Sequence, residues 1–403
     1  MTAQSPLSRH GQRTSNCLKS RVFCEFCRRK SASSEAKRPT FPWKHGQFDV
    51  RWPCLSRRAW MTLAWALVWF VASQVALRSL LQSELQIADA EFGRKLADLR
   101  LAVAAQPDRP LVLMLGSSRV ATGFRPDSLP RHEAPTTKAP LVFNFAQVGS
   151  GPEMAHLSLQ RLLDAGIQPD WVFLEFWPPT WGAERGLKEF MDQINVGCLD
   201  WKSLKLLGGY VSRPRKLDRQ WWNMQLFPLV TQREPLLRHF APSWVLNPSE
   251  PDRRCRNLDR LGWWSPMTSV APEERGRLVE RYRRVYEHRL RRYQVAKTPD
   301  RALREIIALC QREQIRATVV VLPEGQVFRD LYPENALRDV KAYLEGIRRD
   351  CRVEVVDARD WVGDDGFMDG HHLLPEGAAV FTRRLGQDVV QPLLAEAPTP
   401  IRR

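Results

Sequence analysis

The sequence predicts an α/β protein. Its main domain is a three-layer α/β/α arrangement around a parallel five-stranded sheet with a helical insert, and one transmembrane helix precedes it. Short apolar runs alternate with helical patterns across residues 109–395, as in parallel strands joined by helical crossovers. About 120 residues, 177–299, interrupt the alternation, and a charge-free run of nineteen residues, 59–77, comes before it.

Residues 1–58 carry most of the positive charge. They hold 13 Lys/Arg against 3 Asp/Glu, which is +10 of the formal +16, and show no helical or strand periodicity. We expect a disordered basic tail. It contains no recognisable nucleic-acid-binding module, so we predict no nucleic-acid partner.

Cys24 and Cys27 form one tight pair of possible metal ligands, with Cys17 and Cys54 as further candidates, but a structural zinc site normally has two such pairs. We therefore predict no metal and no cofactor.

The run 59–77 fits a membrane anchor. Nineteen helical residues span about 28 Å, close to the hydrocarbon core of a bilayer. The run is longer than the apolar part of a signal peptide, and no clear small-residue cleavage site follows, which favours an anchor over a cleaved signal. Because basic residues precede the run, we expect residues 1–58 in the cytoplasm and residues 78–403 outside it. The protein would then cross the cell membrane once, with the lipid bilayer as a partner. Residues 78–108 have helical apolar spacing. They predict a juxtamembrane helix, either a stalk or a helix packed on the flank of the domain.

Five strands and their helices follow in order. We expect strands at residues 111–115, 140–145, 171–176, 317–322 and 353–356, and helices at 154–163, 300–313, 335–349 and 375–394, with a tail at 396–403. Polar side chains stand at four strand ends, namely Ser118, Asn144, Glu175 and Glu324. The carboxyl ends of parallel strands share one edge of a sheet, where sites collect.

The insert 177–299 is rich in Trp and Arg and includes a basic helix at about 275–293. We expect a mainly helical cap over the strand ends, because loops this long are usually lids or binding elements. Its composition could bind sugars, an acidic polymer or phospholipid headgroups, or the insert could be a helical subdomain with its own small core. Cysteines 198, 255, 310 and 351 could form up to two disulfides outside the cytoplasm.

Two distant stretches suggest nucleophilic chemistry. Gly116-Ser117-Ser118-Arg119 ends the first strand, and Asp369-Gly370-His371-His372 precedes the last helix. A serine hydroxyl needs a base within hydrogen-bonding reach, and a carboxylate that accepts from the imidazole fixes its tautomer. We predict Ser118 as nucleophile, His372 as base and Asp369 as the orienting carboxylate. His371 is the less favoured base. The alternative is that the first stretch is an ordinary Gly/Ser turn.

This combination resembles the SGNH (GDSL-like) hydrolase superfamily, whose domain is flavodoxin-like. Gly116-Ser117-Ser118 is similar to its first block, with Ser117 where the family usually has Asp. Asn144 to Gly149 matches the second block, and Asp369-x-x-His372 matches the last. The resemblance covers roughly residues 110–175 and 315–390. The layout is similar to that of membrane-anchored extracytoplasmic members, the alginate O-acetylation proteins and the D-alanyl transfer protein of teichoic acid modification.

The resemblance implies an acyltransferase or esterase that acts on an O-acyl group of a cell-envelope or exported polysaccharide. Its partners would be a polysaccharide or acyl-donor substrate and an envelope protein complex. The amides of Ser118 and Gly149 would hold the oxyanion, and Asn144, in the same block as Gly149, would bind the oxyanion or the substrate. The alternative is a non-catalytic envelope scaffold of the same fold.

One departure from the family pattern concerns the third block, which normally supplies an Asn as oxyanion donor. The matching strand end here carries Glu175 and no Asn. Loss of one donor typically costs about 100- to 1000-fold in rate. Another donor, such as Arg119 or an amide at Ser118, could replace the Asn, or the protein could catalyse weakly. A carboxylate near an oxyanion is unfavourable unless Glu175 faces Arg119, and we expect that pairing. Glu324 could bind substrate or simply cap its loop.

Overall fold

The computed structural model describes residues 56–130, 139–181, 194–245, 254–291 and 293–392. The chain divides into two units, residues 1–60 and 61–403, and the second contains the sheet. Most of the predicted basic tail, with its Cys24 and Cys27 pair, lies outside the described residues, as does the predicted tail 396–403.

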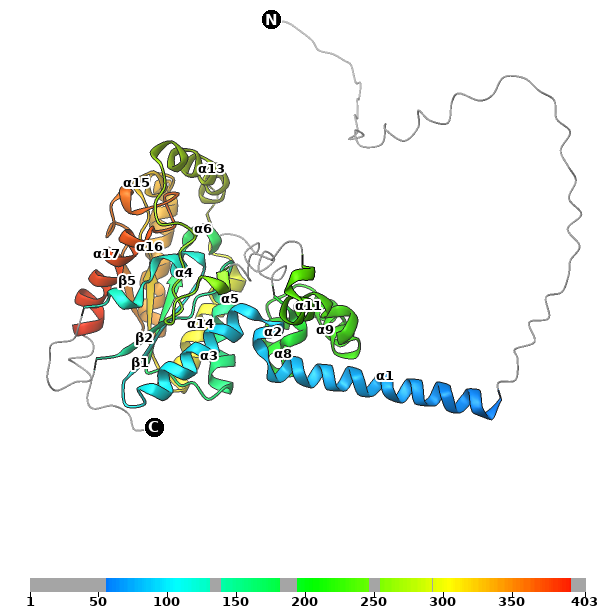
Figure 1. The fold of residues 1–403 in the computed structure, drawn as a ribbon. Helices are drawn as coiled ribbons and strands as arrows, with labels where there is room; N and C mark the ends of the chain where they lie inside the picture. Colours follow the sequence, from blue (N-terminus) through cyan, green and yellow to red (C-terminus); the bar gives the residue numbers. More distant parts are fainter. Residues whose placement is uncertain (1–55, 131–138, 182–193, 246–253, 292, 393–403) are drawn as a thin grey trace, which may run out of the picture. The chain divides into compact units, whose positions relative to one another are not determined.

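The sheet has five parallel strands in the order β2-β1-β3-β4-β5 (Figure 1). The predicted α/β class and five-stranded parallel sheet are confirmed. The strands are β1 (Leu111–Leu115), β2 (Leu141–Asn144), β3 (Trp171–Phe176), β4 (Arg316–Val321) and β5 (Glu354–Asp357). Because the order runs outward from β1 in both directions, the topological switch point lies between β1 and β3, where α/β proteins typically bind ligands.

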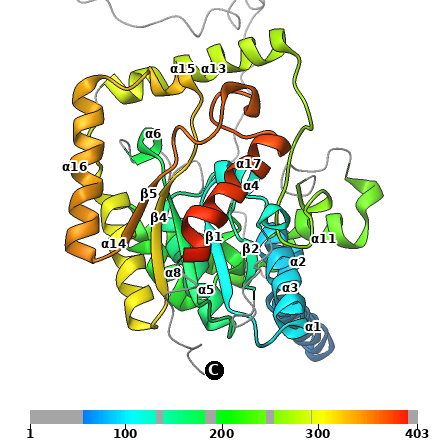
Figure 2. The same cartoon turned by 90° about the vertical axis from the view of Figure 1, so that its left-hand side faces the viewer.

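Both faces of the sheet are covered, which explains the continuous apolar runs. Leu113, Leu174 and Val319 pack on one face with α3 (Ala90–Ala105), α5 (Pro152–Asp164), α14 (Lys297–Arg312) and α16 (Glu334–Cys351). The alternate residues Val112, Phe173 and Val320 pack on the other with α4 (Ser118–Gly123) and α17 (Pro375–Leu385). Figure 2 shows α17 in front of the strands and α14 and α5 behind them. The three layers follow from this alternation.

The N-terminal helices lead into the core. The predicted anchor lies inside α1 (Arg57–Ser83), which is long and apolar enough to cross a bilayer or to be a signal sequence, and most of its apolar side chains are exposed. After α1 the chain forms α2 (Leu85–Ala88) and then α3. Phe92, Leu96 and Leu99 of α3 are buried in the main core. In the structure, residues 90–105 of the predicted juxtamembrane segment therefore form a helix packed on the domain and not a free stalk.

Among the described residues of the insert, two groups of helices pack in different places. The first contains α8 (Trp201–Gly208), α9 (Pro214–Leu226), α10 (Pro228–Thr231) and α11 (Arg233–Phe240), with a small core of its own beside α5 and α2. The second is α13 (Pro272–Arg291), which packs on α6 (Pro178–Trp181) and α15 (Gln326–Arg329) after β3 and β4. Of these helices, α13 packs beside the ends of β3 and β4, whereas α8–α11 pack beside α5 and α2.

The predicted disulfides are absent among the described residues. Cys198, Cys255, Cys310 and Cys351 are all free thiols. Burial raises the pKa of Cys310 to about 12. That thiol is therefore a core side chain and not a reactive group.

Candidate active site

Ser118 stands just beyond the carboxyl end of β1. The strand ends at Leu115, Ser117 caps α4 by accepting a hydrogen bond from Arg119 N (3.2 Å), and Ser118 is the first residue of that helix. Gly116 allows this turn because a Cβ there would lie 2.5 Å from Val120 Cγ2 and 2.6 Å from Glu175 Oε2. The close approach of β1 and β3 loops thus requires glycine at this position.

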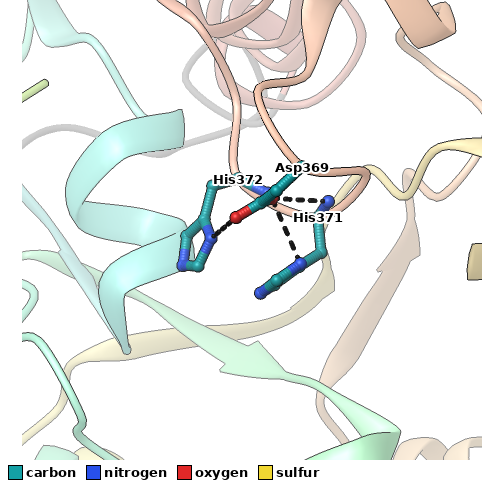
Figure 3. A group of neighbouring side chains, drawn as sticks. All are labelled: Asp369, His371 and His372. Carbon is teal, nitrogen blue, oxygen red and sulfur yellow. Dashed lines mark hydrogen bonds and ion pairs between the residues drawn. The ribbon is translucent and has the colours of Figure 1, made fainter. Parts of the chain in front are cut away.

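Ser118, His372 and Asp369 form one hydrogen-bonded line. Ser118 Oγ lies 2.8 Å from His372 Nε2, although the two residues are 254 positions apart. His372 Nδ1 lies 2.8 Å from Asp369 Oδ2 (Figure 3). The other carboxylate oxygen, Oδ1, accepts from the backbone amides of His372 (2.8 Å) and His371 (3.1 Å). The structure therefore brings the three predicted residues together, in the order that lets a hydroxyl pass its proton to an oriented imidazole.

The surroundings keep Asp369 ionised. Burial alone would raise its pKa, but the neighbouring His372 and His371 and their hydrogen bonds outweigh burial and lower the pKa well below the usual range. Asp369 is only 3% exposed. A buried, charged carboxylate at Nδ1 is what stabilises an imidazolium when His372 takes a proton.

His371 has a different role from His372. Its Nδ1 lies 3.2 Å from Asp369 Oδ1, and its ring stacks on Trp177 at 5.2 Å and 11° (ring centroids) and on Phe328 at 4.8 Å. Tyr282 meets the same ring edge-on at 4.7 Å. Burial lowers the pKa of His371 well below its ordinary value, and the nearby His372 and Arg119 lower it further. His371 is thus a neutral side chain that holds the loop in place.

Asp369, His371 and His372 also carry side chains of the kind that bind metal ions, and their ligand atoms lie within 4.8 Å of one another. His372 uses one ring nitrogen toward Ser118 and the other toward Asp369, both at 2.8 Å. This use of both ring nitrogens fits a proton relay.

The Ser118 and Gly149 amides remain the candidates for an oxyanion hole. Gly149 has a φ of +78°, a conformation that favours glycine. Within the described residues, no protein acceptor receives a hydrogen bond from either amide. Both are therefore free to donate to a developing negative charge.

The predicted binding role of Asn144 is wrong. Its side chain is fully buried. Nδ2 donates to Val120 O (2.8 Å) and Phe124 O (2.7 Å), while Oδ1 accepts from Ala146 N (3.1 Å). These bonds use the amide to tie the end of β2 to α4, so it cannot contact a substrate.

Arg119 and Glu175 form the expected ion pair, with Nη1 3.7 Å from Oε1. Of the possible substitute donors, Arg119 does not face the oxyanion, because the residue is 1% exposed and its other nitrogens donate to carbonyls. Nε donates to His371 O (3.2 Å), and Nη2 donates to Pro323 O (2.7 Å). Glu175 Oε2 accepts from Ser117 N (2.6 Å). The pair therefore braces the nucleophile turn against the histidine loop.

Glu324 does not bind substrate in this arrangement either. It is fully buried, and its Oε1 accepts from Trp177 Nε1 (2.9 Å) and Tyr332 OH (2.8 Å). Sequence reasoning missed the aromatic wall around His371, formed by Trp177, Tyr282, Tyr286 and Phe328. The signal available for the two tyrosines was their spacing of four on the basic helix.

Comparisons with known proteins bear on parts of the chain. One family model, which carries no description, matches residues 279–394, a span that includes Asp369 and His372 but not Ser118. No curated protein matches the sequence. Among solved structures, the chain is similar to a proposed acylhydrolase from Bacteroides fragilis, with 11% identity and a TM-score of 0.32, over 73% of this chain and 96% of that one.

Proposed function

We propose that this protein is a membrane-anchored, extracytoplasmic serine acyltransferase or esterase of the SGNH type. The observation that carries the proposal is the Ser118–His372–Asp369 line, with contacts of 2.8 Å at both steps. The line sits at the topological switch point of a parallel sheet, on loops that Arg119 and Glu175 hold together.

The geometry supports a two-step reaction. Ser118 Oγ attacks the acyl carbonyl carbon while His372 Nε2 takes the hydroxyl proton, and Asp369 stabilises the resulting imidazolium. The amides of Ser118 and Gly149 hold the oxyanion. Collapse of the tetrahedral intermediate breaks the ester C–O bond, and His372 returns the proton to the leaving alcohol. The acyl group on Ser118 then passes to an acceptor hydroxyl or to water, with His372 again as base.

Two amides make a weaker oxyanion hole than three donors. A missing donor typically costs about 100- to 1000-fold in rate. A rate lowered by this factor is compatible with slow transfer onto an envelope or exported polysaccharide. The missing Asn donor also favours the second candidate function, a non-catalytic binding or scaffold protein with this fold. An envelope protein complex would be the natural setting of either.

The location follows from α1. We propose that residues 59–77 span the membrane with residues 1–58 in the cytoplasm, because the basic excess precedes the apolar run. The domain that contains Ser118 then faces the extracytoplasmic side.

A fluorophosphonate probe tests the proposal on the full-length protein in detergent. We expect labelling of the wild type, loss of labelling in Ser118→Ala, and normal labelling in Ser128→Ala, which changes a serine outside the site. An unlabelled wild type would favour the scaffold. Labelling that survives in Ser118→Ala would place the nucleophile elsewhere.

A further inference from the structure

Four large apolar side chains are exposed at the junction of α9 and α10. Leu226, Phe227, Leu229 and Val230 are 55%, 47%, 55% and 64% exposed. We call residues 226–230 the apolar tip. The small core of the insert lies elsewhere, among residues such as Leu204, Leu207 and Trp221. The side chains of the tip therefore do not contribute to the core of this subdomain. Neighbouring exposed apolar side chains of this kind normally contact a membrane or another protein.

The tip lies against α1 at a defined height. Leu229 N donates to Gln74 Oε1 of α1 (3.3 Å), and Gln74 is only 6% exposed. One turn further on, Leu77 and Leu80 of α1 and Leu236 of α11 pack against one small apolar cluster, which consists of Leu81, Ile87 and Ala88. Gln74 stands three residues before the end of the apolar run 59–77, so it lies about 4.5 Å inside that run at 1.5 Å per residue. The tip is thus level with the outer part of the segment proposed to cross the membrane.

The contact also explains the glutamine. An unpaired amide inside hydrocarbon is costly, so polar residues in membrane-spanning segments normally have partners. Leu229 N belongs to the first turn of α10, whose amides have no acceptor within their own helix. Each group satisfies the other, which is how a polar pair is tolerated in an apolar layer.

The charge of the helical subdomain that contains the tip is compatible with a lipid surface. Residues 199–245 contain eight Lys/Arg against three Asp/Glu. Lys202, Arg215 and Lys216 are exposed, as are Trp222 (48%) and Trp244 (77%). Helices with an apolar edge, exposed basic residues and tryptophan typically lie in the membrane interface, with the cations at the phosphate level.

We propose that the apolar tip inserts into the outer leaflet beside α1 and gives the domain a second contact with the bilayer. This inference rests on the proposed membrane anchor. Two contacts, one spanning and one interfacial, fix the height and tilt of the domain above the membrane.

Lipid photolabelling tests the inference on the full-length protein. The chain is reconstituted in vesicles that contain phosphatidylglycerol and a phospholipid with a diazirine on its acyl chain, and labelled peptides are mapped by mass spectrometry. We expect label in α1 and in residues 226–230. The tip should carry about tenfold more label than the peptide with Val380, an apolar side chain 41% exposed on α17, because the probe lies within the hydrocarbon layer.

The outcomes separate the inference from the anchor itself. Label in α1 with none above the Val380 level in the tip overturns the inserted tip and leaves the anchor intact. No label in either overturns both. Val230→Asp should lower tip labelling about tenfold and leave α1 labelling unchanged, because a carboxylate is costly in hydrocarbon. The matched Val380→Asp should change neither, and tip labelling that persists in Val230→Asp contradicts the inference.

Discussion

Asp369→Asn is the sharpest perturbation of the proposed relay. In the wild type, Oδ1 accepts from two backbone amides and Oδ2 accepts from His372 Nδ1 at 2.8 Å. Asparagine has the same shape but one oxygen, and we expect that oxygen to remain on the two amides. The new NH2 group then faces His372 Nδ1. Two donors cannot face each other, so the ring adopts the other tautomer and its proton moves to Nε2.

The wrong tautomer removes the base without dismantling the site. Nε2 lies 2.8 Å from Ser118 Oγ, and once it carries the proton it cannot accept another. The expected loss is about 10⁴-fold in rate, the scale for this substitution in a Ser-His-Asp triad. That is about 5 kcal/mol of transition-state stabilisation, at 1.36 kcal/mol per tenfold.

The rate constant for fluorophosphonate labelling measures this loss without knowledge of the natural substrate. The melting temperature is followed in parallel. Asp364→Asn is the matched control, since Asp364 Oδ1 accepts from Gln326 N (2.7 Å) and has no contact with His372 among the hydrogen bonds of the described residues. A loss below tenfold in Asp369→Asn, with an unchanged melting temperature, would refute the reasoning.

Three further predictions concern the support of the site and the pH dependence of the fold. Arg119→Gln leaves the buried Glu175 without its cation and should lower the free energy of unfolding in urea by about 3–5 kcal/mol. A decrease of less than about 1 kcal/mol would contradict a bracing role for Arg119. Gly116→Ala sets a methyl group 2.5 Å from Val120 Cγ2 and should cost about 1–3 kcal/mol by the same assay, and unchanged stability would count against the tight turn. Burial lowers the pKa of His156 to about 4. The unfolded chain gains this proton below its ordinary pKa of about 6.5, so stability should fall by about 3 kcal/mol between pH 6.5 and 4. His156→Gln should remove that part of the slope, and an identical slope would refute the assignment.

The sheet was predictable from the sequence because its signals are local. The runs at 111–115 and 171–176 are too short for helices and are continuously apolar, which suits only strands covered on both faces. Ser118 and the Asp369–His372 pair were predictable for a related reason. They stand at the ends of such elements with the spacing that the chemistry requires, and the sheet topology then brings them to one edge.

The roles of the other polar residues were not predictable, because sequence gives the position of a side chain but not its direction. Asn144 stands at the edge of the sheet yet turns inward to satisfy carbonyls of α4. Glu324 likewise accepts from Trp177 and Tyr332 inside the core. Long-range contacts were hidden for the same reason, since nothing local to Tyr282 indicates the histidine loop it covers.

The most direct test of the central claim is to trap the acyl group on Ser118. The full-length protein is mixed with an activated acetyl ester, quenched in acid within the first turnover, digested and analysed by mass spectrometry. The account predicts one acetyl group on the peptide that contains Ser118, and none on that peptide in Ser118→Ala. An acetyl group confined to another residue, or no acyl-protein at all with an ester that the protein turns over, would contradict it.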